Sequence, residues 1–303
     1  MNWTFLRWGM LTMVLFCTTI ANSQEERNKP LQVVINDVKY TQKEQDTSLG
    51  SVLGGIAQAV ASGSEYRSTT RHADYKDAVL AAVVNGISKT HRVRVVDGTD
   101  PTSDLTREQD FNMGVAISNI STSSRMETET VRERINGEYK ERKVTKTYYN
   151  GMIGVSLQIK DVATGEIVNS PTFSVASTDY EKSKSTEEAL SSAMKILSGR
   201  VRNYFNSKYP LSGRIIENAT AKKDKLKEVY IDLGSENKVY KGMHFIVYSV
   251  MMIGNNEARE QIGKLKITDV QGDNVSLCKV QSGGKEIKSA TDEGKNVIAI
   301  TTE

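Results

Sequence analysis

Three histidines and a group of aspartates are the residues whose types could bind a metal. His72, His91 and His244 lie in separate segments, and none belongs to an H-x-x-x-H pair or has a cysteine partner in sequence. The aspartates at 97, 100 and 104 supply fewer than half of the ligands that a calcium loop places in sequence. We therefore predict surface or capping roles for the histidines, a solvated loop for the aspartates, and no metal.

A glycine-rich stretch and a cysteine are the other candidates for chemistry. Gly50, Gly54 and Gly55 match neither a phosphate loop nor a dinucleotide fingerprint, and no Lys-Ser/Thr pair follows them. They fit a loosely packed helix, an inserted loop, or a small-residue contact with a membrane or a sister subunit. Cys278 in NVSLCKV indicates a buried small hydrophobe, and the chain has no G-x-S-x-G motif. We predict no catalytic residue, no cofactor and no enzymatic activity.

The stretch RERINGEYKER, residues 132–142, places seven charges around an Asn-Gly pair. Asn-Gly between two β-capable runs predicts a two-residue hairpin, because a type I′ turn needs positive φ at both central residues. Facing residues then have numbers that sum to 273. The facing pairs are Glu133 with Lys140, Arg132 with Glu141, Glu127 with Lys146, and Arg125 with the ring of Tyr148. These facing pairs predict that the charges form a self-complementary ladder, in which each pair contributes about 0.2–1 kcal/mol.

Such a hairpin could contact nucleic acid, tip a membrane pore, or form a water-exposed arm. The matched charges and a net charge of only +3 argue against nucleic acid. A pore strand needs ~9–11 residues with one apolar face, and neither face of residues 124–135 is apolar. We therefore expect an exposed arm over about residues 122–149. Its candidate contact residues are Arg132, Arg134, Asn136, Gly137, Tyr139, Lys140 and Arg142.

The first 23 residues are typical of a secretory signal peptide. Arg7 gives a short positive region, an apolar run covers residues 8–16, and Ala21 and Ser23 occupy the small-residue positions of a cleavage site before Gln24. The apolar run is far shorter than the ~20 residues of a spanning helix, so no transmembrane span is expected after cleavage.

Cys17 offers a lipoprotein alternative, because a cysteine after an apolar run can be a lipid acceptor. Against it, Phe16 occupies a position where such signals usually carry Gly, Ala or Ser. After cleavage only Cys278 would remain, which excludes an intramolecular disulfide.

The elements between residues 31 and 210 predict an α/β domain. PLQVVINDVKY predicts a first, interior strand, and a helix capped by Asp74 follows with an apolar stripe at Val79, Val83 and Ile87. RVRVVD, FNMGVAISNI and YYNGMIGVSLQIKD predict strands, with a turn at DVATGEIV. A last helix begins with a Ser185/Glu188 capping box and ends before Pro210.

From residue 211 onward, short β-like runs alternate with turn residues. The runs are SGRIIENA, EVYIDLG, MHFIVYSVM, IGKLKITDV, NVSLCKV and NVIAIT. With no helix expected between them, they predict a small all-β barrel. The predicted organisation is a signal peptide (1–23), an α/β domain (24–210) with a mixed sheet, packed helices and the long hairpin, and a β-barrel (211–303).

The order of these elements resembles the CsgG family, named after the curli-secretion channel, which includes the LpoB activators of peptidoglycan synthases. HRVRVVD and DVATGEIV carry this resemblance within residues 31–208. The motif DLG followed by VYKGMHFIVY resembles the C-terminal barrel of the flagellar assembly protein FlgT. Channel-forming members are typically lipoproteins and push hairpins through the outer membrane. This chain departs from them, because it lacks a good lipid-acceptor cysteine.

Both resemblances imply a bacterial envelope protein, periplasmic or associated with the outer membrane, that binds other proteins and has no active site. We expect an accessory or assembly factor that binds through the hairpin, through free sheet edges, or both. The expected partners are envelope proteins, including copies of this chain, and not nucleic acid. The alternative is an oligomeric ring component of a CsgG-type secretion or export apparatus.

Overall fold

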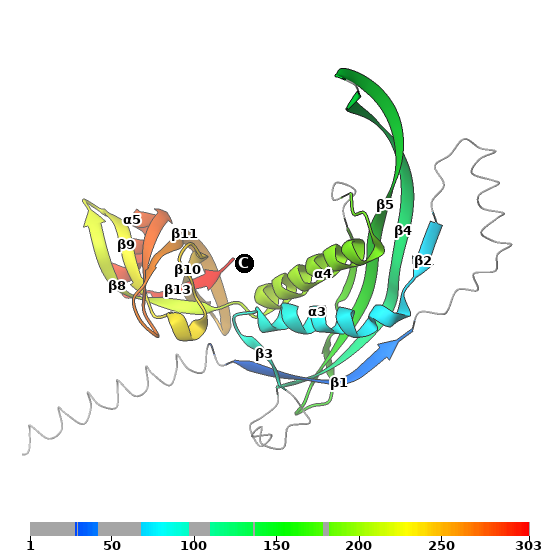
Figure 1. Ribbon diagram of the computed structural model, residues 1–303. Helices are drawn as coiled ribbons and strands as arrows, with labels where there is room; N and C mark the ends of the chain where they lie inside the picture. The colour runs from blue at the N-terminus through cyan, green and yellow to red at the C-terminus, as the bar shows by residue number, and fades with distance from the viewer. Residues whose placement is uncertain are drawn as a thin grey trace, which may run out of the picture. The chain divides into compact units, whose positions relative to one another are not determined.

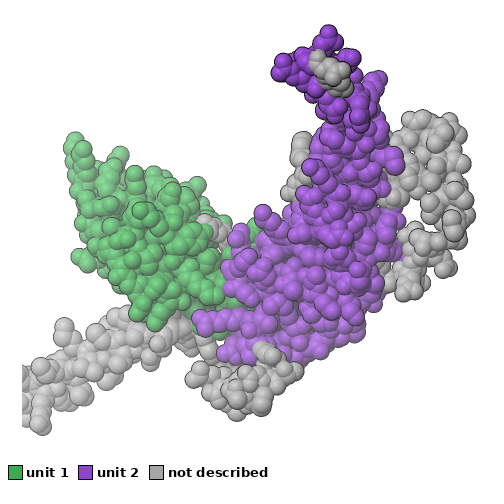
Figure 2. Space-filling model, viewed as in Figure 1, with its two compact units in different colours: residues 1–31, 90–93, 203–303 green, residues 32–89, 94–202 purple. Residues whose placement is uncertain are grey.

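The computed structural model describes residues 28, 30–41, 68–96, 110–135, 137–177 and 182–302. Two compact units are distinguished (Figure 2). Unit 1 comprises residues 1–31, 90–93 and 203–303, and unit 2 comprises residues 32–89 and 94–202. Strands dominate the described residues of both units.

A mixed sheet of seven strands forms the framework that carries the hairpin (Figure 1). Its strands are β1 (Leu31–Tyr40), β2 (Ser68–Arg71), β3 (Val93–Val96), β4 (Phe111–Ile135), β5 (Glu138–Asp161), β6 (Ile167–Asn169) and β7 (Thr172–Ala176). The order is β3-β1-β4-β5-β6, with β2 also paired to β4 and β7 to β5. β1 runs parallel to β4, whereas β4 and β5 are antiparallel. The predicted interior position of β1 is therefore confirmed.

Two helices, α3 (Lys76–Ser88) and α4 (Thr186–Lys208), lie along one face of this sheet (Figure 1). The apolar stripe predicted for α3 is fully buried at Val79, Val83 and Ile87. The prediction that Asp74 caps the start of α3 is wrong, because Asp74 lies inside a 3₁₀ turn, Ala73–Tyr75, that precedes α3. A short turn continuous with the helix leaves this aspartate no helix start to cap.

The start of α4 follows the predicted capping box only in part. Ser185 Oγ accepts a hydrogen bond from the Glu188 N–H at 3.2 Å. The Glu188 carboxylate accepts from the N–H of Lys184, one residue earlier than the box requires, at 2.7 Å. The first contact satisfies an N–H group that the first helical turn leaves unpaired, whereas the second ties down the residue before the cap.

Six strands close into a barrel in unit 1, in the order β10-β11-β12-β9-β8-β13. They are β8 (Ser212–Lys222), β9 (Lys225–Ile231), β10 (His244–Ile253), β11 (Asn256–Val270), β12 (Ser276–Ser282) and β13 (Asn296–Thr301), with a 3₁₀ turn at Ser235–Asn237. Each strand overlaps one of the six predicted runs. The expectation of no helix among them is wrong, because α5 (Gly284–Asp292) lies between β12 and β13 and places Ile287 and Ala290 in the barrel core.

The predicted fold class is confirmed for the mixed sheet and the closed barrel. The expectation of an α/β domain needs correction, because α3 and α4 are the α-helices that cover the sheet and the described chain is mostly β. Cys278 is fully buried in the barrel core, as predicted, and burial raises the pKa of its thiol to about 12. Among the described residues, no helix is both long and apolar enough to cross a membrane.

Candidate functional site

The hairpin of β4 and β5 is the candidate site, and its register is the predicted one. Facing residues sum to 273 from the pair Ile135 and Glu138 down to Asn119 and Gly154. Below that pair the register shifts by one residue, at a bulge between Ile117 and Asn119. The turn therefore sets the pairing of the whole arm, and the bulge marks where the strands enter the body of the sheet.

The arm becomes a two-stranded ribbon above the sheet. β2 pairs with residues 121–124 of β4, and β7 pairs with residues 152–156 of β5. Tyr149 and Ser183 form an isolated antiparallel bridge just above β7. Beyond these contacts, residues 125–135 and 138–148 pair only with each other among the described strands. The tip of this ribbon stands clear of the rest of unit 2 (Figure 2).

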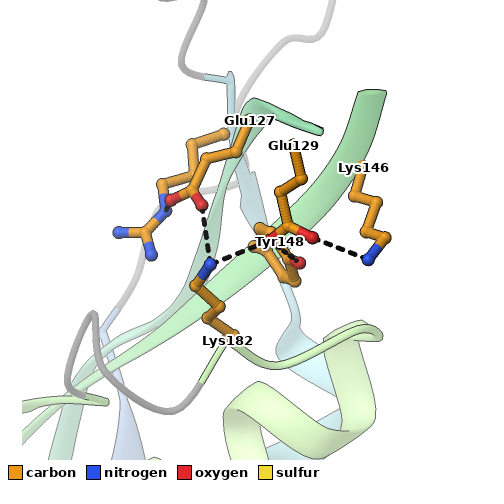
Figure 3. Close-up of polar contacts among 6 residues, drawn as sticks. Glu127, Glu129, Lys146, Tyr148 and Lys182 are labelled. Carbon is orange, nitrogen blue, oxygen red and sulfur yellow. Dashed lines mark hydrogen bonds and ion pairs between the residues drawn. The ribbon is translucent and has the colours of Figure 1, made fainter. Parts of the chain in front are cut away.

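A polar clamp at the base of the ribbon centres on Glu129 (Figure 3). Its carboxylate accepts hydrogen bonds from Lys146 Nζ at 2.7 Å, Tyr148 Oη at 2.8 Å and Lys182 Nζ at 2.9 Å. Lys182 Nζ also lies 3.1 Å from Glu127 and 5.1 Å from the centroid of the Tyr148 ring. Since Lys182 comes from the segment before α4, the clamp ties both strands of the arm to the body of unit 2.

The clamp shifts the pKa of each of its members so that the hydrogen-bonded form is favoured. Hydrogen bonds from Lys146, Lys182 and Tyr148 lower the pKa of Glu129 from 4.5 to about 2. The hydrogen bond to Glu129 raises the pKa of Tyr148 and, in the same way, the pKa values of Lys146 and Lys182. Each charged or hydroxyl form is held because its partner stabilises it. Lys182 has a φ of +35°, a backbone conformation that lysine rarely adopts.

Close backbone packing holds the arm just below this clamp. Gly151 of β5 lies against the first turn of α4, where an added Cβ would be 2.7 Å from the carbonyl carbon of Ala189. The Gly151 N–H donates to Ser177 Oγ at 2.8 Å. The arm thus leaves the sheet from a point where α4 and β5 are in backbone contact.

The predicted charge ladder is confirmed at one pair and wrong at another. Arg132 Nε donates to Glu141 at 2.8 Å, as the register requires. Glu127 faces Lys146, but it pairs instead with Arg125 at 2.9 Å and with Lys182, whereas Lys146 reaches Glu129. Glu127 and Lys146 change partners because Lys182, which lies outside the hairpin, offers Glu127 a further cation.

The predicted contact residues gather at the end of the arm. Arg134 Nε donates to the Gly137 carbonyl at 3.3 Å, and its guanidinium lies 5.9 Å from the centroid of the Tyr139 ring, which is 73% exposed. Lys140 and Arg142 are also exposed, and Gly137 has the positive φ (+90°) expected of the turn. Whether these residues contact a partner stays a prediction. Asn136 lies outside the described residues.

Removing the carboxylate of Glu129 is expected to loosen the base of the arm. The Glu129→Gln change should speed amide hydrogen exchange across residues 145–149, because Lys146 and Lys182 lose their shared anion. In the unchanged chain this protection should be complete above pH 4.5 and should be lost as the pH falls toward about 2, because the pKa of Glu129 is lowered on folding.

Exchange rates measured by mass spectrometry between pH 6 and pH 2, corrected for intrinsic exchange, check this prediction. The control is Glu133→Gln, an exposed arm carboxylate that the described structure places in no ion pair. Equal exchange in the two variants would show that the clamp does not hold the arm.

The residues with metal-binding side chains lie apart. His72 Nε2 is 2.8 Å from Thr122 Oγ1, and His244 Nδ1 is 3.1 Å from Gln281, while the ring of His91 stacks on Tyr240. No group of three His, Cys, Asp or Glu side chains in the described part of the chain is arranged to hold a metal. Several predicted positions lie outside the described residues, namely Cys17, Ala21, Ser23, Gln24, Gly50, Gly54, Gly55, Asp97, Asp100 and Asp104.

The sequence did not reveal the third partner of the clamp. Lys182 follows a strand by several residues, and no periodicity or motif connects it with Glu129, 53 positions earlier. Helix α5 did carry a signal: glycines at 283 and 294 bracket a run in which Ile287 and Ala290 have helical spacing.

Comparisons with known proteins identify no family. No family model matches the chain, and no curated protein matches it. Among solved structures, the chain is similar to a hypothetical protein from Chlamydia trachomatis at 9% identity and a TM-score of 0.31, over 59% of this chain and 97% of that one. A protein from Xanthomonas campestris matches at 10% identity and a TM-score of 0.29, over 58% and 82%. A lipoprotein from Neisseria meningitidis matches at 12% and 0.21, over 59% and 99%. Likenesses this low carry no inference about the chain.

Proposed function

We propose that this chain is a non-enzymatic exported envelope protein that binds other proteins through the end of its β4–β5 arm. It acts as an accessory or assembly factor in the periplasm or at the outer membrane. In this proposal the sheet of unit 2 is a CsgG-like module and the barrel is a FlgT-like module. The signal-like first 23 residues and the motifs HRVRVVD, DVATGEIV and DLG…VYKGMHFIVY support these assignments.

The observation that carries the proposal is a projecting ribbon with a fixed base and an exposed end. The base is tied down by Glu129, Lys146, Tyr148 and Lys182, so that the arm enters binding with a defined direction. A preorganised arm loses less conformational entropy on binding than a mobile loop. At the end, Tyr139 offers an exposed aromatic surface next to Arg134, and Tyr and Arg are enriched in binding hot spots.

Site-specific photocrosslinking in the native cell tests this role. A benzophenone amino acid in place of Tyr139 should give crosslinks to a second envelope protein, which mass spectrometry identifies. The matched control replaces Ile167, a 54% exposed residue on β6 of the same unit. Crosslinks at both positions alike, or at neither, would refute a specific contact at the end of the arm.

A ring-forming secretion component is the second candidate. The outer edges of β4 and β5 along residues 125–135 and 138–148 have no further strand partner among the described residues, so an arm from another copy could pair with them. Light scattering of the purified chain distinguishes the two functions: a ring gives a large oligomer of defined mass, and an accessory factor does not. Crosslinks from position 139 to the same chain would also favour the ring.

A further inference from the structure

A groove opens in the wall of the barrel where β8 separates from β13. The two strands pair at only three positions, from Ser212 with Ile300 to Arg214 with Ile298. β8 then continues to Lys222 without β13 beside it. Register shifts on β8, between Ile215 and Glu217 and again after Asn218, mark bulges that bend this strand.

The groove has a volume of about 540 Å³, within the range of small-ligand sites. Its walls come from β8, from the end of α5 and from the start of β13. They comprise Arg214, Ile215, Ile216, Glu217, Asn218, Thr291, Lys295, Asn296 and Val297. All of these residues belong to unit 1, so this groove is separate from the arm of unit 2.

Arg214, a half-buried residue of this groove, has one side-chain donor, Nε, without a partner. Its Nε is buried and has no hydrogen-bond partner in the described part of the chain. Its main-chain N–H is already donated to the Asp232 carboxylate, and Lys295, the other cation of the groove, is paired with Glu293 at 2.8 Å. A buried guanidinium N–H without an acceptor is costly, and a carboxylate is the acceptor that matches its geometry.

The remaining lining favours a polypeptide over a simple anion. The amides of Asn218 and Asn296 each offer both donors and an acceptor, as peptide groups do. Glu217 can accept a hydrogen bond from a peptide N–H of such a segment. Ile216, which is 53% exposed, adds an apolar contact at the same place.

Strand addition alone does not account for this groove. Bulges commonly protect a free edge from pairing, and β8 is bulged beside the opening. Protection of an edge does not require a buried guanidinium N–H that lacks an acceptor. Recognition by side chains, led by a charge-assisted hydrogen bond to Arg214, fits both features.

We propose that the β8–β13 groove is a second binding site, which takes a short extended segment of a partner polypeptide with its carboxylate side chain on Arg214. The segment lies between the diverging strands, and its peptide groups contact Asn218, Asn296 and Glu217.

Titration of the purified full chain with two blocked tripeptides tests this site. Acetyl-Val-Glu-Val-amide should shift the side-chain Nε–Hε signal of Arg214 in nuclear magnetic resonance spectra and should bind at least about tenfold more tightly than acetyl-Val-Gln-Val-amide. The Arg214→Gln variant should lose this preference, whereas Arg259→Gln, which removes an exposed arginine of β11, should retain it. If Arg214→Gln does not fold, the Arg214 signal of the unchanged chain still reports binding.

Three results would overturn the proposal. The first is equal affinity for the two tripeptides, or no binding of either. The second is a preference that survives Arg214→Gln in a folded protein. The third is inorganic phosphate binding as tightly as the glutamyl peptide at the same signal, which would make the groove a site for small anions. None of these results bears on the role of the arm, because the arm lies in the other unit.

Discussion

Replacing Gly283 by alanine is expected to destabilise the barrel strongly. Gly283 joins β12 to α5 with a φ of +75°, and a Cβ at this position would overlap the carbonyl oxygen of Ile262 and lie 2.6 Å from the Cα of Gly263. The left-handed conformation costs a non-glycine residue about 1–2 kcal/mol. Forcing a methyl group into packed backbone adds about 1–3 kcal/mol.

The expected loss is therefore roughly 2–5 kcal/mol, measured as the free energy of unfolding in urea by circular dichroism. Gly294→Ala is the matched control, because Gly294 has a φ of +69° but no atom within 4 Å of an added Cβ. The control should show only the conformational cost. Similar losses in the two variants would mean that the approach of β11 to the β12–α5 corner is not tight.

The second large effect is expected at Gly151, where the arm meets α4. A Cβ there would overlap the carbonyl oxygen of Ala189 and lie 3.0 Å from the nitrogen of Leu190, both backbone atoms of the helix. Neither can move without shifting the start of α4. We expect Gly151→Ala to cost about 1–3 kcal/mol, near the upper end of that range.

Gly151→Ala should also affect the arm, because the clamp residue Lys182 lies in the segment that leads into α4. Urea unfolding measures the loss of stability, and amide exchange across residues 145–149 reports the arm. The control is Gly114→Ala on β4, where the nearest atom to an added Cβ, the Asp37 oxygen, is 3.8 Å away. Gly114→Ala should be neutral or slightly stabilising, because glycine weakens a strand interior. A neutral Gly151→Ala would contradict the contact between α4 and β5.

The local signals of the sequence were sufficient for most strands, for α3 and α4, and for the register of the arm, but not for β2 or α5. The Asn-Gly pair sets the facing of every residue as far down as Asn119, since a two-residue turn leaves no freedom in the pairing. Apolar spacing alone found the buried face of α3, where Val79, Val83 and Ile87 are fully buried. Both results depend only on neighbours within one turn or one hairpin.

The clamp and the groove were decided only by the tertiary structure, because both depend on contacts between segments that are distant in the sequence. Lys182 enters the clamp because β7 and the loop before α4 bring it to Glu129, and its presence moves Glu127 away from Lys146. The groove at Arg214 lies where β8 parts from β13, a strand more than 80 residues later, beyond the pair Arg214 and Ile298. Side-chain partners across such separations are chosen by packing and not by local propensity, so no pattern in the sequence could name them.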